Sequence, residues 1–200
     1  MRLRLIGAPL DQAYHQELQA QIAASPHGDR IELIAGLTRA ETIAALAKAQ
    51  VFLLPSLVEG CSMAMLEAAA AGCVCIASDV GGARDLHGAG GSVVLLPSPL
   101  GELQSVTQQQ FFAAAASELP DHAKRVADAL RMVWQEYETF AAGVAETRAR
   151  LHRFSGMQQM TDAYLLAYTM AFRGGPSGNR DAPRAPRSPV GVEADAPAPA

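Results

Sequence analysis

Residues 51–82 read VFLLPSLVEGCSMAMLEAAAAGCVCIASDVGG. This stretch contains two short apolar runs, Val51–Leu54 and Cys73–Ala77, with an alanine-rich segment between them. Two apolar runs joined by a helical segment are typical of a βαβ unit, in which a crossover helix connects parallel strands. We therefore predict a strand at each run and, between them, a helix that begins near Ser62.

The alternation of strands and helices continues on both sides of this unit. Further strands are predicted at residues 3–7, 31–35 and 92–96, and a further helix at residues 11–25. Thr38 and Glu41 form a predicted capping box at the start of another helix. Right-handed crossovers place such helices on both faces of the sheet. The predicted fold is a single α/β domain with a parallel sheet.

No strand is predicted after residue 100. Helices are expected at Leu100–Leu119, from Asp121 to about Arg153, and at Phe154–Phe172, where Ser155 is a candidate cap. Residues 174–200 contain six of the twelve prolines and no aromatic residue. Such a segment cannot bury enough surface to offset its ordering entropy. We predict a folded domain at residues 1–173 and a disordered Pro/Ala/Gly-rich tail at residues 174–200.

Composition excludes several classes of protein. The net charge is −4, which argues against nucleic acid or an anionic membrane as a partner held by bulk charge. Cys61, Cys73 and Cys75 form neither a disulfide framework nor a zinc-ligand set, which indicates reduced thiols and a cytoplasmic location. No apolar run approaches the roughly 18 residues of a membrane span, and the N-terminus lacks a signal peptide. The five scattered histidines are each predicted to lie at the surface.

The candidate site is the loop between the first apolar run and the alanine-rich helix. Glu59 lies in the loop, and Gly60 allows the backbone to approach a ligand closely. The amides of Cys61, Ser62 and Met63 lie near a helix N-terminus, which favours anions such as phosphate. Glu67 lies about one turn inside the helix, where its carboxylate is suited to accept hydrogen bonds from sugar hydroxyls.

Alternative interpretations remain open for each of these features. Glu67 could simply favour the helix dipole, although its apolar surroundings favour a function, because burying an unpaired charge is costly. The Asp79–Gly82 turn is either a tight connection that requires positive φ or a second side of the same cleft. Gly7 is a candidate for a third side, and Leu37 lies near the same rim.

The residues at 51–60, 66–72 and 76–82 resemble the donor-binding, C-terminal half of GT-B retaining glycosyltransferases of group 1. Their hallmark is a pair of glutamates separated by seven residues, which Glu59 and Glu67 match. The resemblance implies a Rossmann-like domain that binds a UDP-sugar or GDP-sugar, usually without a metal or other cofactor. It implies that Glu59 lies beside the donor sugar and Glu67 holds the ribose.

By the same resemblance, the amides of residues 60–63 contact the sugar and phosphate, and Leu37 lies by the base. Family members also have an acceptor-binding N-terminal domain and a basic pair for the diphosphate, for which Arg2 and Arg4 are poor substitutes. We therefore expect the isolated chain to show no turnover and to need a partner acceptor domain. The alternative is a non-catalytic nucleotide-sugar or protein-interaction module. An apolar patch at Met157, Met160, Tyr164 and Tyr168 would favour a homodimer.

Overall fold

The computed structural model describes residues 1–102, 105–155, 161–162 and 164–166. By its internal contacts the chain divides into two units, Met1–Gln159 and Met160–Ala200. The predicted boundary at residue 173, the predicted tail and most of the predicted last helix lie outside the described residues. All strands and helices named below lie in the first unit.

All five predicted strands are present, and their pairing is parallel as predicted. They are β1 (Leu3–Ile6), β2 (Ile31–Ile34), β3 (Val51–Leu54), β4 (Val74–Ser78) and β5 (Val93–Leu96). The α/β fold class is therefore confirmed. It differs from the prediction in one respect, because the strands form two sheets, with the orders β1–β2 and β3–β4–β5.

Side-chain caps start the first two helices of the chain. Asp11 accepts from the Ala13 and Tyr14 amides, and Thr38 forms the predicted capping box with Glu41. The Thr38 hydrogen bonds lower the pKa of the Glu41 carboxyl. The elements are α1 (Gln12–Ala24), the 3-10 turn η1 (Gly28–Arg30), α2 (Arg39–Leu46), α3 (Met63–Ala71) and α4 (Ala83–Leu86).

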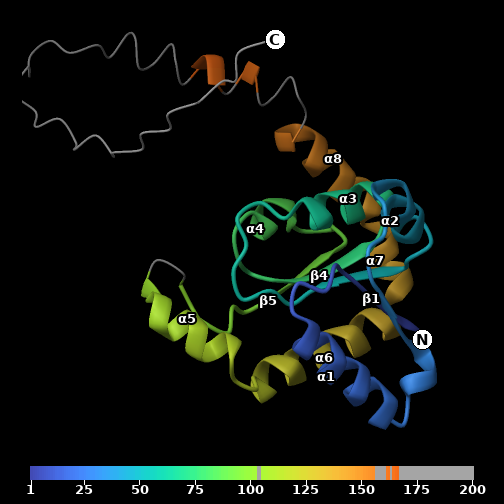
Figure 1. Ribbon diagram of the computed structural model, residues 1–200. Coiled ribbons are helices and arrows are strands. Elements are labelled where there is room, and N and C mark those ends of the chain that lie inside the picture. Colours follow the sequence, from blue (N-terminus) through green and yellow to red (C-terminus); the bar gives the residue numbers. More distant parts are fainter. Residues whose placement is uncertain (103–104, 156–160, 163, 167–200) are drawn as a thin grey trace, which may run out of the picture. The chain divides into compact units, whose positions relative to one another are not determined.

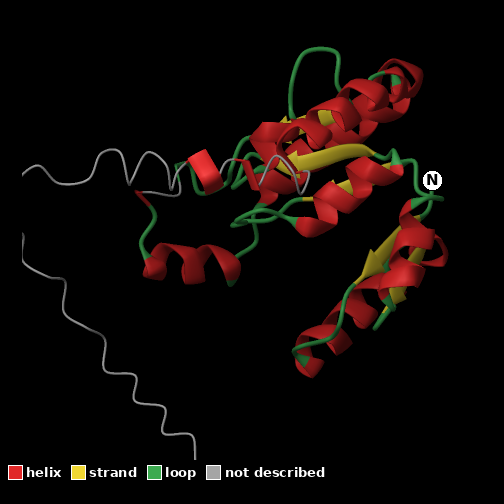
Figure 2. Cartoon of the chain, turned by 90° about the horizontal axis from the view of Figure 1, so that it is seen from above, coloured by secondary structure: helices red, strands yellow, loops and turns green. Residues whose placement is uncertain are grey.

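Helices cover both faces of the three-stranded sheet, as Figures 1 and 2 show. On one face, Met65 and Ala68 of α3 share an apolar cluster with Cys75 of β4. On the other face, Val133 of α6 (Pro120–Gln135) packs in a second cluster with Ile76 of β4. Because it is covered on both faces, β4 is buried along its whole length.

Two predicted helices differ from the structure after residue 100. The prediction of one helix from Asp121 to about Arg153 is wrong. The segment is α6, α7 (Tyr137–Ala142) and α8 (Val144–Ser155), with breaks at Glu136 and Gly143. A Cβ at Gly143 would lie 2.5 Å from the Gly90 carbonyl oxygen, so the chain turns where it meets this loop. In the range 100–119, the described helix is only α5 (Gln108–Ala115), which Thr107 caps.

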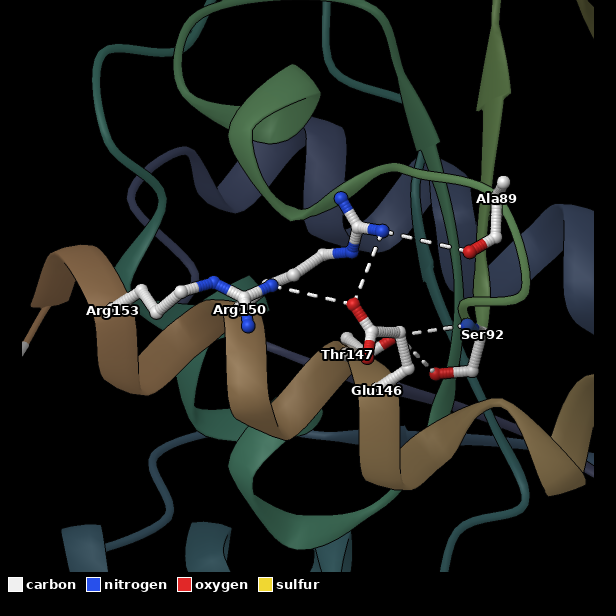
Figure 3. Close-up of polar contacts among 6 residues, drawn as sticks. All are labelled: Ala89, Ser92, Glu146, Thr147, Arg150 and Arg153. Carbon is white, nitrogen blue, oxygen red and sulfur yellow. Dashed lines mark hydrogen bonds and ion pairs between the residues drawn. The ribbon is translucent and has the colours of Figure 1, made fainter.

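Helix α8 is attached to the domain by a buried polar contact, drawn in Figure 3. The fully buried Thr147 hydroxyl accepts from the Ser92 amide at 2.8 Å and from the Ser92 hydroxyl at 3.0 Å. Arg150 donates to the Ala89 carbonyl at 3.5 Å and pairs with Glu146 at 3.1 Å. These contacts fix α8 against the loop that precedes β5.

His122 corrects the prediction that every histidine lies at the surface. It is on α6, only 7% exposed, and its Nε2 lies 3.5 Å from the Ser78 hydroxyl at the end of β4. Its position on the first turn of an amphipathic helix, facing the sheet, explains the burial. No other histidine among the described residues is buried.

The three thiols are expected to differ sharply in reactivity. Cys61 is exposed, whereas Cys73 and Cys75 are fully buried. Burial raises the pKa of Cys73, and burial together with the Cys73 thiol raises the pKa of Cys75 to about 12. At pH 8, one thiol per chain should react quickly with a chromogenic disulfide reagent, and the other two only after unfolding.

The variant Cys61→Ser provides the control, because it should leave no fast thiol. Fast reaction of more than one thiol in the native protein would contradict the packing of β4.

The raised pKa of Cys75 also predicts how the free energy of unfolding depends on pH. An unfolded thiol ionises near 9.0 and the folded one near 12. The free energy of unfolding should therefore fall as pH rises through this range.

None of the helices in the described part of the chain combines the length and apolar character needed to cross a membrane.

Candidate functional site

The first part of the candidate site is the loop between β3 and α3. The Ser56 hydroxyl donates to Glu59 Oε1 at 2.8 Å, which holds this half-buried carboxylate in one orientation. Ser62 is the N-cap of α3, and its hydroxyl accepts from the Met65 amide at 3.4 Å. The helix therefore begins where the sequence predicts. The loop amides lie at the positive end of a nine-residue helix.

Glu67 lies on α3 and has a basic partner that the sequence did not indicate. Its Oε1 is 3.7 Å from a guanidinium nitrogen of Arg39, the first residue of α2. The Glu67 side chain is 26% exposed and that of Arg39 is 80% exposed. The pair thus lies at the surface, where an ion pair is weak and a ligand can replace one partner.

The glycine turn after β4 packs directly on the Glu59 loop. The Gly82 amide donates to the Gly60 carbonyl at 2.7 Å. Gly81 has a φ of 54°, and a Cβ there would overlap the Gly60 carbonyl oxygen and lie 2.5 Å from that of Glu59. The first interpretation of this turn is confirmed, because Gly81 needs positive φ. The turn also packs on the loop that carries the first carboxylate, while its role as a second side of a cleft stays a prediction.

An ion pair stabilises the same turn. Arg84 donates from Nε to Asp79 Oδ1 at 3.0 Å and pairs with the second carboxylate oxygen as well. Asp79 raises the pKa of this guanidinium. The pair connects the end of β4 to the short helix α4 and so fixes the backbone that carries Gly81 and Gly82.

The remaining predicted site residues lie at the ends of β1 and β2. The Gly7 amide donates to the Ile34 carbonyl at 3.1 Å. Leu37 is half-buried and lies between the end of β2 and the Thr38 cap of α2. Within the described residues, no hydrogen bond or ion pair joins Gly7 or Leu37 to the Glu59 loop.

The structure therefore brings together the two loops and, through α2 and α3, Arg39 and Glu67. These features are a loop with backbone donors at the N-terminus of α3, the Glu59 carboxylate held by Ser56, and the Glu67 carboxylate one turn further along the same helix. Such a surface can bind a ligand that combines an anionic group with vicinal hydroxyls. Arg39 was missed because its sequence context indicates only the first turn of a helix. Its place beside Glu67 depends on the packing of α2 against α3.

Residues 1–109 match the family described as "Glycosyl transferases group 1". Among solved structures, the chain is similar to sucrose-phosphate synthase from Thermosynechococcus elongatus. The TM-score is 0.63 at 18% identity, and the match covers 87% of this chain and 39% of that one. No curated protein matches.

The chain is also similar to HepE from Anabaena. Against its complex with UDP the TM-score is 0.62 at 17% identity, with 84% of this chain and 41% of that one covered. Against its complex with UDP-glucose the TM-score is 0.60 at 18% identity, with the same coverage. At these identities the similarity concerns the fold alone. The chain spans about two fifths of the length of these structures.

Proposed function

The chain belongs to the group 1 glycosyl transferases, and from this we propose that it binds the donor of a retaining glycosyl transfer, a nucleotide-diphosphate sugar. The observation that carries the proposal is the βαβ unit in which Glu59 and Glu67 flank the amides at the start of α3. The family match spans this whole unit. The HepE structures, which were solved with UDP and UDP-glucose, favour a uridine nucleotide as the first ligand to test.

The two carboxylates have separate proposed roles. Glu67 accepts hydrogen bonds from the ribose hydroxyls, and Arg39 leaves this carboxylate when the ribose binds. Glu59, held by Ser56, faces the donor sugar and is the proposed catalytic residue. The amides of Gly60, Cys61, Ser62 and Met63 bind the sugar and diphosphate, while Leu37 and Gly7 border the nucleotide. No metal or cofactor enters this proposal.

Catalysis in a cleft requires positioned groups on both sides of the substrate. We propose that the second side comes from an acceptor-binding domain, so the isolated chain should bind a donor without transferring its sugar. A sugar-transfer assay with UDP-glucose should detect no product beyond hydrolysis in buffer. The second candidate function is a non-catalytic nucleotide-sugar binding or protein-interaction module. A cytoplasmic location also remains a proposal and rests on the cysteine pattern.

Calorimetric titration tests donor binding directly. UDP, UDP-glucose and GDP-mannose are titrated into the chain, and one nucleotide series should bind. Glu67→Gln should weaken that binding by at least about tenfold, because it removes the charge-assisted hydrogen bonds to the ribose. Glu59→Gln should weaken UDP-glucose more than UDP, since Glu59 is proposed to face the sugar.

Glu138→Gln is the matched control, an exposed glutamate on α7 for which no hydrogen bond or ion pair to either loop is found among the described residues. It should leave binding unchanged. If no nucleotide or nucleotide sugar binds, or if Glu67→Gln and Glu138→Gln behave alike, the donor-site proposal is wrong.

A further inference from the structure

Arg39 lies at a position that the stability of its own helix does not favour. It is the first residue of α2, at the end where the helix dipole is positive and a cation is disfavoured. Glu41, in the same turn, does not offset this charge, because its carboxylate accepts from the Thr38 amide and hydroxyl of the capping box. In the part of the chain that the structure describes, Glu67 is the one carboxylate that pairs with Arg39. The guanidinium is therefore directed towards α3.

The pair between Arg39 and Glu67 is loose. The guanidinium nitrogen and Glu67 Oε1 are 3.7 Å apart, which is too long for a hydrogen bond, and the Arg39 side chain is 80% exposed. An ion pair of this kind contributes little to stability. By contrast, Arg84 in the glycine turn donates to both carboxylate oxygens of Asp79. Of these two guanidinium groups, Arg39 is the one that a ligand can recruit without breaking hydrogen bonds.

The surface around Arg39 carries more negative than positive charge. Glu59 lies in the first loop, Glu67 lies in the helix that follows it, and the Asp85 carboxylate lies against the glycine turn. The proposed donor adds the negative charge of a diphosphate. The start of α3 offsets only about half an elementary charge. Binding of a phosphate group there is therefore favoured by a side-chain cation.

Glu67 and the start of α3 are close enough for Arg39 to reach both. Helix α3 begins at Met63, four residues before Glu67. Side chains of a helix tilt towards its N-terminus, so the Glu67 side chain is directed back along the turn that begins at the loop amides. One helical turn is about 5.4 Å long. Rotation of a long, exposed arginine side chain can cover such a distance.

We propose that Arg39 binds phosphate in the donor site, and that it exchanges the Glu67 carboxylate for the phosphate next to the ribose when a nucleotide binds. The ribose hydroxyls replace Arg39 on Glu67, and the freed guanidinium, a planar fork of donors, binds the phosphate oxygens. The inference rests on the proposed function, because it requires that Glu67 holds the ribose. It makes Arg39 a determinant of specificity for nucleotides over nucleosides.

A purely competitive role for Arg39 is the alternative. If Arg39 only shields Glu67 in the unbound chain, its removal leaves the carboxylate free, and every ligand with a ribose binds more tightly. The observations favour the exchange, because an exposed side chain held at 3.7 Å blocks little. The two roles predict opposite signs for the effect of Arg39→Gln on nucleotide affinity.

Titration of a nucleoside and its phosphates measures the role of Arg39. Uridine, UMP and UDP are titrated into the chain, with guanosine, GMP and GDP in parallel, and amide chemical shifts detect binding even in the millimolar range. Arg39→Gln should weaken binding of the mono- and diphosphate at least about tenfold, because it removes a charge-assisted contact, and change nucleoside binding less than about twofold. Arg39→Lys, which keeps the charge without the fork, should recover part of the loss.

Arg131→Gln is the matched control. It removes the same charge from an exposed arginine in a surface ion pair, here with Asp128 at 2.7 Å, and should leave binding of every ligand unchanged. Arg131 also lines an apolar cavity of about 420 Å³ beside Trp134 of α6. Weaker UDP binding in Arg131→Gln, with none in Arg39→Gln, would assign the nucleotide to that cavity and overturn the proposal.

Salt provides a second readout of the same contact. The difference in UDP affinity between Arg39→Gln and the unmodified chain should shrink as NaCl rises from about 0.05 to 0.5 M, because an exposed charge contact is screened. A difference that salt does not change would contradict a contact between the guanidinium and the phosphate. Urea unfolding should show equal stability for the two proteins, since the substituted side chain is 80% exposed.

The outcomes distinguish this inference from the proposed function. Tighter binding of nucleoside and nucleotides alike in Arg39→Gln, or an equal loss for all of them, would overturn the role of Arg39 and leave the donor site in place. If the unmodified chain binds no member of either series, the donor-site proposal is wrong and the role of Arg39 is refuted with it.

Discussion

Gly81→Ala should destabilise the protein by about 3 to 5 kcal/mol, because the added Cβ meets two obstacles at once. The backbone at residue 81 has a positive φ of 54°, and the methyl group would overlap the carbonyl oxygen of Gly60. The Glu59 loop must move to accept it. Urea unfolding followed by circular dichroism measures the change in the free energy of unfolding.

Gly90→Ala separates the two causes. Gly90 has a similar φ of 73°, but a Cβ there would meet no atom within 4 Å. This variant should lose only about 1 to 2 kcal/mol, from backbone strain alone. Equal losses for the two variants would show that the glycine turn does not pack on the Glu59 loop.

Thr147→Val should cost about 2 to 4 kcal/mol of unfolding free energy. The substitution conserves the shape of the side chain but removes the oxygen that accepts from the Ser92 amide and hydroxyl. Ser92 is fully buried, so in this variant its amide and its hydroxyl would each lose their hydrogen-bond acceptor. Helix α8 should loosen first, which hydrogen exchange in residues 144–153 would detect.

Thr147→Ser is the matched control for this substitution. It keeps the hydroxyl and removes only a methyl group, so it should cost about 1 kcal/mol. If Thr147→Val cost no more than Thr147→Ser, the hydrogen bonds that the Thr147 hydroxyl accepts from Ser92 would contribute nothing measurable to stability.

The strands and the first helices could be predicted because local signals specify them. The aliphatic runs, the Thr38 capping box and the Ser62 cap each act over a few residues. The family resemblance also rested on local residues, since the glutamates at 59 and 67 and the flanking turns lie within one βαβ unit. This part of the site was visible because its chemistry is contiguous in sequence.

The features that the sequence did not predict depend on contacts between segments that are distant in the chain. Arg39 reaches Glu67 only because α2 packs on α3, and His122 is buried only because α6 lies on the sheet. The break between α7 and α8 at Gly143 reflects close approach to the Gly90 loop, which no helical periodicity encodes. Likewise, each strand was predictable on its own, but the split between β1 and β3 is a property of pairing, which depends on all five strands.

The proposed function requires that the loop at residues 59–63 and the Glu67 region of α3 form one nucleotide-sugar site. Amide chemical-shift mapping during titration with UDP-glucose follows both parts in a single experiment. We expect the largest shifts at residues 60–63 and 67, with smaller ones at residues 81–82, which pack on the same loop. Shifts confined to α6 and the cavity beside Trp134, with none in residues 59–67, would contradict the proposed site.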